Sequence, residues 1–348
     1  MTTLRERNFR RLKQSIVGEK SDGHAVFNYY TYPFFQAVTG VKLDDFFHKP
    51  EVTLECQVEA LEKIDGIGDL VPDMGSVAVA SGLGGIVKFD DQGYISVHPN
   101  PRIAEAETVE DLDWLKPGDP YGDNYMRQAL ETLQYMVEHC PKGYRVNPHA
   151  VQGSFTTAAN IRGISDCCAD TLVEPEIVNR ILDVVVETQI RFMKAQEKIL
   201  GSLHHILVGD DLSAFLSEPT YREFILPRYQ QMFKEFPNTQ RWLHNDSTAR
   251  HVAPAIGDSG MVAWQYHPDI SPHDALELTK GKVSLLGGLS PLDLQKWTAD
   301  ETYDKCIEVL KSFEGNNKCV LAAGGSINQV PLENLKAMFK AADDYKIK

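Results

Sequence analysis

The stretch Thr239-Gln-Arg-Trp-Leu-His-Asn-Asp246 has an apolar centre followed by polar side chains, the pattern of a buried strand that ends at a polar loop. Seven other stretches also show an apolar run that ends in polar or glycine residues: His24–Tyr29, Gly66–Asp73, Tyr144–Val151, His204–Asp211, Met261–Asp269, Val283–Ser290 and Cys319–Ser326. Between them the chain is long enough for at least one helix each time. Eight strands that alternate with helices predict an α/β fold, a (β/α)8 TIM barrel.

Two segments fall outside the eight units. Within residues 1–20, apolar residues recur at helical spacing, which predicts an N-terminal helix. Its basic residues indicate a solvated face or a contact with a partner: Arg5, Arg7, Arg10, Arg11 and Lys13. After the second strand, residues 77–101 contain two alternating runs around the turn Asp90–Gly93, which predicts an inserted β-hairpin. We expect residues 1–348 to form a single domain.

Charge and cysteine usage limit the class of protein. The formal net charge of −14 argues against nucleic-acid and anionic membrane partners, because both are bound through clustered Lys and Arg. No apolar run is long enough to span a membrane, and the first residues lack a signal-peptide core. Six cysteines without a CxxC pair favour a reduced, cytoplasmic protein. A homodimer is a further expectation.

The most informative strand end is His244-Asn245-Asp246. An imidazole and a carboxylate at positions i and i+2 of an extended segment point the same way. They could share a zinc ion, which accepts nitrogen and oxygen ligands, or orient a substrate as catalytic groups. A third ligand would have to come from elsewhere, and the candidates are Asp210, Asp211, Glu223 and His267. The alternative is a hydrogen-bonded His–Asp pair without metal.

Other strand ends also carry candidate residues. Asp210 and Asp211 end the fourth strand, where carboxylates of a barrel work as acid, base, ligand or anchor. One carboxylate of such an adjacent pair normally points inward, and the other points toward backbone amides. His149 ends the third strand and is equally a substrate donor or a structural histidine.

Aromatic and glycine residues complete the expected substrate site. Tyr29, Tyr30 and Tyr32 follow the first strand and would suit a flat, apolar or aromatic ligand. Tyr266 or His267 should reach the barrel mouth after the sixth strand. Gly287 and Gly325 either let a ligand approach the backbone closely or form tight turns.

Taken together, these motifs resemble the uroporphyrinogen decarboxylase-like superfamily, which includes the decarboxylase and corrinoid-dependent methyltransferases. The similarity covers nearly the whole chain and depends on the order of its motifs: Arg5-Glu6-Arg7, Gly153-Ser154-Phe155-Thr156, Val208-Gly209-Asp210-Asp211, Leu216-Ser217-Glu218-Pro219, Tyr221–Pro227, Leu243-His244-Asn245-Asp246, Leu286–Pro291 and Gly324-Gly325-Ser326. The resemblance implies a (β/α)8 barrel, in agreement with the strand pattern.

Two departures from the superfamily pattern narrow the function. The true decarboxylase carries arginines that bind porphyrin carboxylates in the segment that here reads Phe27–Pro33 and holds none. Superfamily methyltransferases that act on a thiol hold zinc on His-x-Cys and a later Cys. Here His244 matches the histidine, whereas Asp246 and Gly325 stand at or near the cysteine positions. These positions therefore offer harder metal ligands than the soft thiolates of the thiol-dependent enzymes, which argues against a thiol as the methyl acceptor.

The resemblance therefore implies a corrinoid-dependent methyltransferase, closer to the O-demethylase branch than to the decarboxylase. A small methylated donor, expected to be a methoxylated aromatic, would pass its methyl group to cob(I)alamin. The chain has no Asp-x-His-x-x-Gly motif, so the cobalamin would arrive on a partner corrinoid protein. One alternative is a decarboxylase or lyase of a small carboxylic acid, with Asp210 or Asp211 and His244 as its acid–base groups. Another is a barrel that binds a ligand without turnover.

Overall fold

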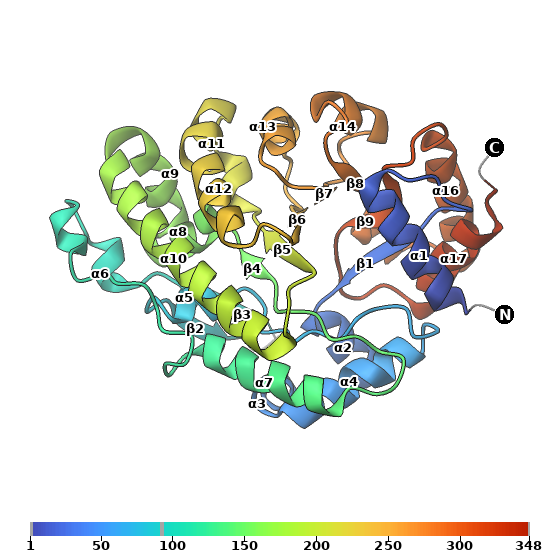
Figure 1. Cartoon of the computed structure of the whole chain (residues 1–348), viewed down its shortest axis with the longest axis horizontal. Coiled ribbons are helices and arrows are strands. Elements are labelled where there is room, and N and C mark those ends of the chain that lie inside the picture. Colours follow the sequence, from blue (N-terminus) through green and yellow to red (C-terminus); the bar gives the residue numbers. More distant parts are fainter. Residues whose placement is uncertain (1–2, 91–93, 347–348) are drawn as a thin grey trace. The chain divides into compact units, whose positions relative to one another are not determined.

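The computed structural model describes residues 3–90 and 94–346 and has a TIM-barrel-like α/β fold. Seven strands form the main sheet (Figure 1) and are hydrogen-bonded in the order β1 (Val26–Tyr30), β9 (Cys319–Ile327), β8 (Ser284–Leu289), β7 (Ala263–Gln265), β6 (Gln240–His244), β5 (His205–Gly209) and β4 (Val151–Gln152). The pairs β1–β9, β9–β8, β8–β7, β7–β6 and β5–β4 are parallel. The predicted fold class is thus confirmed.

The expected second strand is much shorter than its sequence suggests. Of the run 66–73, only Leu70 pairs with a neighbour, through an isolated parallel bridge to Val146. Gly68 has a φ of 158° just before the bridge, and Pro72 just after it has no N–H to donate. The backbone can therefore pair with a neighbouring strand at only one position.

The chain divides into two compact units. Unit 1 comprises Met1–Val41, Glu55–Asp69 and Trp242–Lys348, and unit 2 comprises Lys42–Leu54 and Leu70–Arg241. Strand β6 begins in unit 2, where the amide of Gln240 donates to the carbonyl of His204, and ends in unit 1. The single domain expected from the sequence stays a prediction.

Helices of unit 1 flank its five strands. The last two helices, α16 and α17, pack against each other, α16 against β8 and β9 and α17 against β1 (Figure 1). The helical segments that lie wholly in this unit are α1 (Leu4–Val17), α2 (Tyr32–Thr39), η3 (Arg250–Val252), α13 (Ala253–Asp258), α14 (Pro272–Leu278), α15 (Pro291–Leu294), α16 (Ala299–Ser312) and α17 (Leu332–Asp344). Helix α4 (Pro50–Glu62) belongs partly to each unit.

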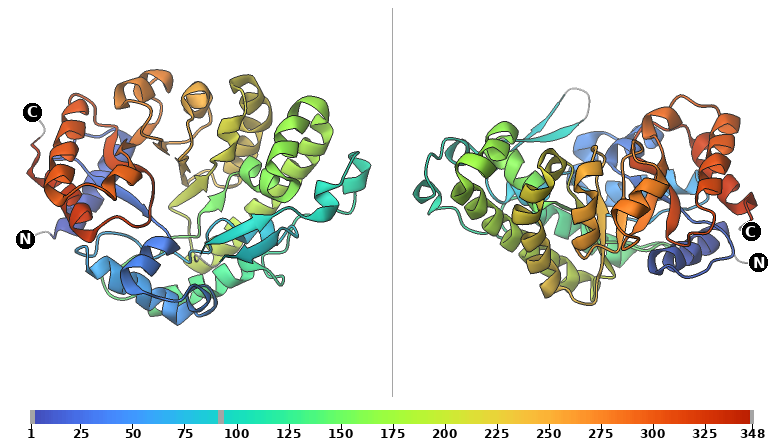
Figure 2. Two further views of the ribbon diagram at one scale, coloured as in Figure 1. Left: turned by 180° about the vertical axis from the view of Figure 1, so that it is seen from behind. Right: turned by 90° about the horizontal axis from the view of Figure 1, so that it is seen from above.

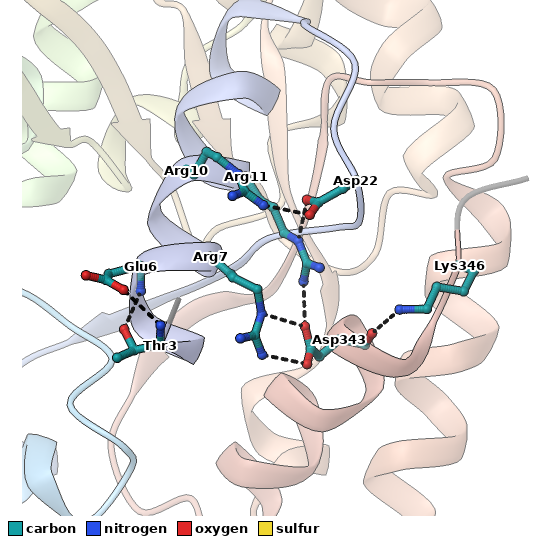
Figure 3. A network of polar contacts seen from close by, with 8 residues as sticks. All are labelled: Thr3, Glu6, Arg7, Arg10, Arg11, Asp22, Asp343 and Lys346. Carbon is teal, nitrogen blue, oxygen red and sulfur yellow. Dashed lines mark hydrogen bonds and ion pairs between the residues drawn. The ribbon is translucent and has the colours of Figure 1, made fainter. Parts of the chain in front are cut away.

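The N-terminal helix is confirmed, and its arginines make internal contacts. A capping box between Thr3 and Glu6 starts α1. Figure 3 shows the ion pairs that follow: Arg7 and Arg11 bind Asp343 of α17, and Arg10 and Arg11 bind Asp22. Arg7 and Arg11 therefore join the two ends of the described chain, whereas Arg10 and Lys13 are exposed, as expected of a solvated face. A contact with a partner stays a prediction.

Unit 2 contains a group of three adjacent helices and the inserted hairpin. Helices α8 (Ser154–Arg162), α9 (Ile164–Val173) and α10 (Pro175–Leu200) lie side by side (Figure 1). The hairpin pairs β2 (Ile86–Phe89) with β3 (Ile95–His98) in antiparallel fashion, and β3 contacts α8 (Figure 2). The predicted hairpin is confirmed, although residues 91–93 of its expected turn lie outside the described residues.

The segment between β5 and β6 holds two consecutive α-helices. These helices, α11 (Glu218–Phe224) and α12 (Leu226–Glu235), meet at Ile225 because Pro227 in the first turn of α12 has no N–H to continue the earlier helix. The remaining helical segments of unit 2 are α3 (Leu43–His48), α5 (Ala78–Ser81), α6 (Pro101–Ala104), η1 (Glu110–Leu112), α7 (Tyr125–His139) and η2 (Leu212–Phe215). No described helix is both long and apolar enough to cross a membrane. No disulfide joins any cysteines in the part of the chain that the structure describes.

Candidate functional site

Side chains of β1 and β6 meet although three strands, β9, β8 and β7, separate them in the sheet. The rings of Phe27 and Trp242 lie 5.6 Å apart, and those of Tyr29 and His244 lie 4.7 Å apart. Strands that are not neighbours in a sheet can touch only across its concave side. These four side chains therefore lie on the inner face of the unit 1 strands, with Tyr29 and His244 nearer the carboxyl ends.

His244 is the last residue of β6 and is only 5% exposed. Its ring packs on Tyr29, and its Nδ1 lies 2.8 Å from Oε1 of Gln265. His244 pairs with Gln265 in the register of β6 and β7, so both side chains project from the same face. The imidazole is thus fixed by its strand, by an aromatic ring and by a hydrogen bond.

Asp246 lies on the same side as His244, as the i, i+2 spacing predicted. Its Oδ2 is 3.8 Å from Nε2 of His244, too far for a hydrogen bond. Two ligand atoms that share a tetrahedral zinc ion at about 2.0–2.2 Å lie roughly 3.3–3.6 Å apart. The pair could therefore hold one ion after a shift of a few tenths of an ångström. With 44% of its side chain exposed, Asp246 has room for that movement.

Gln265 was not among the predicted site residues, yet it connects β7 to two other strands. Its Nε2 donates to the carbonyl oxygens of Ala323 and Gly325 at 2.7 and 3.0 Å, while its Oε1 faces His244. The sequence signal that could have identified Gln265 is the alternation of side chains between the two faces of a strand. Because Gln265 is the register partner of His244, it lies on the inner face, and the next residue does not.

The sequence predicted that Tyr266 or His267 reaches the barrel mouth. The Tyr266 side chain is fully buried against Trp264, at a ring distance of 5.6 Å, so His267 is the candidate that remains. Gly287 is explained by the same packing, because a Cβ there would lie 2.5 Å from the Tyr266 ring. The position therefore needs glycine for space within the fold. Burial raises the pKa of the Tyr266 hydroxyl above its usual range.

Gly325 lies next to the His244–Asp246 pair. A Cβ at this glycine would be 3.4 Å from Cβ and 3.9 Å from Oδ2 of Asp246. Its φ is not positive, so the backbone itself does not require glycine. The structure therefore places the residue beside the candidate ligands, as the sequence suggested.

The other aromatic and histidine candidates of unit 1 differ in exposure. Tyr30 is buried against Phe34, with a hydrogen bond from Asn28, and burial raises its pKa. Tyr32 is also buried, at the start of α2. His267 is partly exposed after β7, with its Nδ1 2.7 Å from Oδ1 of Asp269. Tyr29 is the tyrosine of the three whose ring contacts His244.

In unit 2, Asp210 is completely buried after β5. Its Oδ1 accepts hydrogen bonds from the amide and hydroxyl of Thr156 at 3.3 and 2.8 Å, and its Oδ2 accepts one from the Tyr229 hydroxyl at 2.5 Å. Burial raises the pKa of this carboxyl, against the opposing effect of these hydrogen bonds. A Cβ at Gly153 would lie 2.1 Å from the Asp210 carboxyl carbon, so the chain has glycine there. Asp210 therefore anchors α8 and α12.

The neighbouring Asp211 is only partly buried and begins η2. The carboxylate of Asp210 binds a backbone amide and two hydroxyl donors, as expected of one member of the pair, and that of Asp211 is partly exposed. That the Asp211 carboxylate points inward stays a prediction. Glu223 is exposed on α11, whose buried residues are Tyr221 and Phe224. Its carboxylate therefore faces solvent.

His149 lies two residues before β4, not at the carboxyl end of a strand where it was expected. The strand begins only at Val151, and His149 is buried against Phe192 of α10, with its amide 2.6 Å from Oε1 of Gln196. Burial lowers its pKa to about 4. The expected position is wrong, and a substrate contact by this residue stays a prediction.

The sequence profile of the uroporphyrinogen decarboxylase (URO-D) family matches residues 30–345. The chain belongs to this family. It is 26% identical over 194 residues to a methylated-thiol–coenzyme M methyltransferase of Methanosarcina mazei, a match that covers 56% of this chain and 52% of that protein. It therefore spans about half the length of that relative.

Two other curated family members cover more of the chain. A methylcobamide:CoM methyltransferase of Methanosarcina barkeri is 22% identical and covers 73% of this chain and 72% of its own length. A uroporphyrinogen decarboxylase of Alkalilimnicola ehrlichii is 23% identical and covers 84% and 80%. The solved structure of a methyltransferase from Methanosarcina mazei superimposes with a TM-score of 0.80 over 99% of both chains, at 20% identity. That structure supports the URO-D fold.

Within unit 1, the donor set of this URO-D family member fits a borderline divalent ion. The imidazole of His244 and the carboxylate of Asp246 are both ligands that zinc accepts. The hydrogen bond from His244 Nδ1 to Gln265 leaves Nε2 free on the side of Asp246. Two residues do not complete a site, so at least one further ligand is required.

Proposed function

We propose that this protein transfers a methyl group from a small methylated donor, a methoxylated aromatic, to cob(I)alamin on a partner corrinoid protein. One observation carries the proposal: the buried His244 directs a free Nε2 toward Asp246 on an inner face lined by Tyr29 and Phe27. Similarity to the two Methanosarcina methyltransferases, at 26% and 22% identity, supports methyl transfer.

His244 and Asp246 would hold a zinc ion together with at least one further ligand. When bound, zinc supplies a Lewis acid at the donor's ether oxygen.

The remaining roles follow from the chain's own residues. The rings of Tyr29 and Phe27 would pack against the flat face of the donor and orient its methoxy group. Transfer breaks the bond between oxygen and methyl carbon, and the departing oxygen must gain a proton. Asp246 is an exposed carboxylate that could deliver it. The partner would have to reach the methyl carbon from the open side of the inner face.

The test combines metal content with turnover. Chelator-washed protein is reloaded with zinc, and methyl transfer is followed by the absorbance change of cob(I)alamin with methoxylated benzoates as donors. We expect about one zinc per chain and turnover in the wild type, and loss of both in His244→Ala and Asp246→Ala. His273→Ala is the control, because His273 is exposed on α14 beside Asp274 and Glu277 and could bind zinc adventitiously.

Turnover of wild-type level in either site variant would refute the role of that residue. Zinc that is lost only in His273→Ala would refute the proposed metal site. Turnover without cobalamin would refute corrinoid-dependent transfer.

The second candidate is a decarboxylase of a small carboxylic acid, which the URO-D family match favours. Porphyrin substrates are disfavoured, since Phe27–Pro33 contains no arginine for their carboxylates. Cobalamin-independent CO2 release that depends on His244 would establish this alternative. Ligand binding without turnover in either assay would favour a barrel that only binds. A homodimer stays an expectation for either function.

A further inference from the structure

We infer that Gln265 is a positioning residue that sets the tautomer of His244, so that Nε2 is always the acceptor at the site. The inference deepens the proposed function and rests on it for its role in methyl transfer. The tautomer itself can be measured without any activity. It depends on three strands of unit 1, namely β6, β7 and β9, and on no residue of unit 2.

The first step is the orientation of the Gln265 amide. Its side chain is 1% exposed and faces the carbonyl oxygens of Ala323 and Gly325 at 2.7 and 3.0 Å. Carbonyl oxygens only accept hydrogen bonds, so the amide NH2 must be the group that faces them. A flipped amide would place its oxygen against two carbonyl oxygens and leave both N–H groups without these acceptors. Oε1 therefore faces His244.

The second step is the tautomer of His244. Oε1 can only accept, and it lies 2.8 Å from Nδ1, so Nδ1 must carry the proton in this contact. A neutral imidazole has a single N–H, so its Nε2 then presents a lone pair. That nitrogen is on the side of Asp246, 3.8 Å from Oδ2. The chain thus fixes which nitrogen can bind a metal ion or accept a proton.

The third step is rigidity. His244 and Gln265 are register partners on adjacent strands and are 5% and 1% exposed, so neither ring nor amide has space to rotate. The two carbonyls belong to β9, and one of them is that of Gly325, the glycine beside Asp246. A residue at position 265 therefore needs an acceptor for His244 and at least one donor for β9. Such partners behind a ligating histidine fix its tautomer and raise its basicity.

The experiment uses ¹⁵N-histidine-labelled, metal-free full-length protein. Long-range ¹H–¹⁵N spectra distinguish the two tautomers by the nitrogen shifts, and the His244→Ala spectrum identifies the His244 signals. Gln265→Leu removes both acceptor and donors. Gln265→Glu keeps an acceptor and, when protonated, one donor. Gln189→Leu is the matched control, because Gln189 is a fully buried amide bonded to Ser154 and Gln152 in unit 2.

We expect wild-type His244 to carry its proton on Nδ1, and Gln265→Leu to shift it toward the Nε2–H form. Zinc affinity, measured by competition with a chromophoric chelator, should fall about 10- to 100-fold in Gln265→Leu and be largely retained in Gln265→Glu. Gln189→Leu should lower the melting temperature without changing either readout.

A wild-type His244 with its proton on Nε2 overturns the inference, and so does a Gln265→Leu variant with the wild-type tautomer. The wild-type spectrum decides even where Gln265→Leu does not fold. If the Nδ1–H tautomer is found but zinc and methyl transfer are absent, the proposed function fails and the positioning inference stands.

Discussion

Substitution of two adjacent aspartates should reduce stability to very different extents. Asp210→Ala would leave three buried donors without an acceptor: the Thr156 amide, the Thr156 hydroxyl and the Tyr229 hydroxyl. Each unsatisfied buried donor costs about 1–3 kcal/mol, partly recovered by relaxation, so we expect a loss of about 3–5 kcal/mol. Asp211→Ala removes a partly exposed side chain and should cost less than about 1 kcal/mol of stability.

The assay is thermal unfolding followed by circular dichroism at pH 7. With an unfolding entropy of about 2.1 cal/mol/K per residue over 348 residues, the expected loss lowers Tm by about 4–7 °C for Asp210→Ala. Asp210→Asn keeps an acceptor for Thr156 and should lie between this variant and the wild type. An Asp210→Ala protein that melts within about 1 °C of the wild type would refute the anchoring role.

Four further predictions concern positions outside this pair. Burial lowers the pKa of His149 to about 4, so the contribution of its neutral form to stability is complete above about pH 6.5 and is lost as the pH falls. In urea titrations the free energy of unfolding of the wild type should fall by about 3 kcal/mol between neutral pH and pH 4. The same free energy should depend less on pH in His149→Gln. Gly287→Ala puts a methyl group 2.5 Å from the Tyr266 ring and should lower the free energy of unfolding by about 1–3 kcal/mol, measured by thermal unfolding. An equal loss when Gly287→Ala is introduced into the Tyr266→Leu variant would contradict the steric cause. Ion pairs with two arginines lower the pKa of Asp343, so Asp343→Asn should lower the free energy of unfolding at pH 7 by about 1 kcal/mol or less, given the one-third exposure of this side chain. In urea titrations at a series of pH values, the difference from wild type should disappear below about pH 4. Gly325→Cys should raise zinc affinity, measured by competition with a chelator, because its Cβ would lie 3.4 Å from Cβ of Asp246. An unchanged affinity would contradict the placement of residue 325 beside the zinc ligands.

The strands were largely predictable because each buried run ends in residues that a strand cannot continue. Seven of the eight runs overlap a strand of the main sheet, although Tyr144–Val151 shares only its last residue with β4. The exception, 66–73, is apolar enough to be a strand, but its backbone is not free to pair. At Ile225 the sequence also held the reason for the break, in Pro227, and the apolar periodicity on both sides concealed it.

The site was predictable where one strand decided the geometry, and less so where two strands had to be aligned. His244 and Asp246 share a face because they are two residues apart, which needs no knowledge of neighbours. The choice between Gln265 and Tyr266 depends on the register with β6, which a single sequence does not contain. His149 was misplaced for a related reason: the apolar run is longer than the part of it that pairs.

The composition of the candidate ligands indicates which part of a methyl transfer the site can assist. Imidazole and carboxylate bind through harder atoms than thiolate, so they leave more positive charge available to polarise a donor oxygen. An ether needs that help, since an alkoxide is a poor leaving group. Gly325 has no side chain beside Asp246, and a catalytic site needs an open position next to its ligands. The residues that would exclude a thiolate site therefore also provide space for the oxygen of a methoxylated donor.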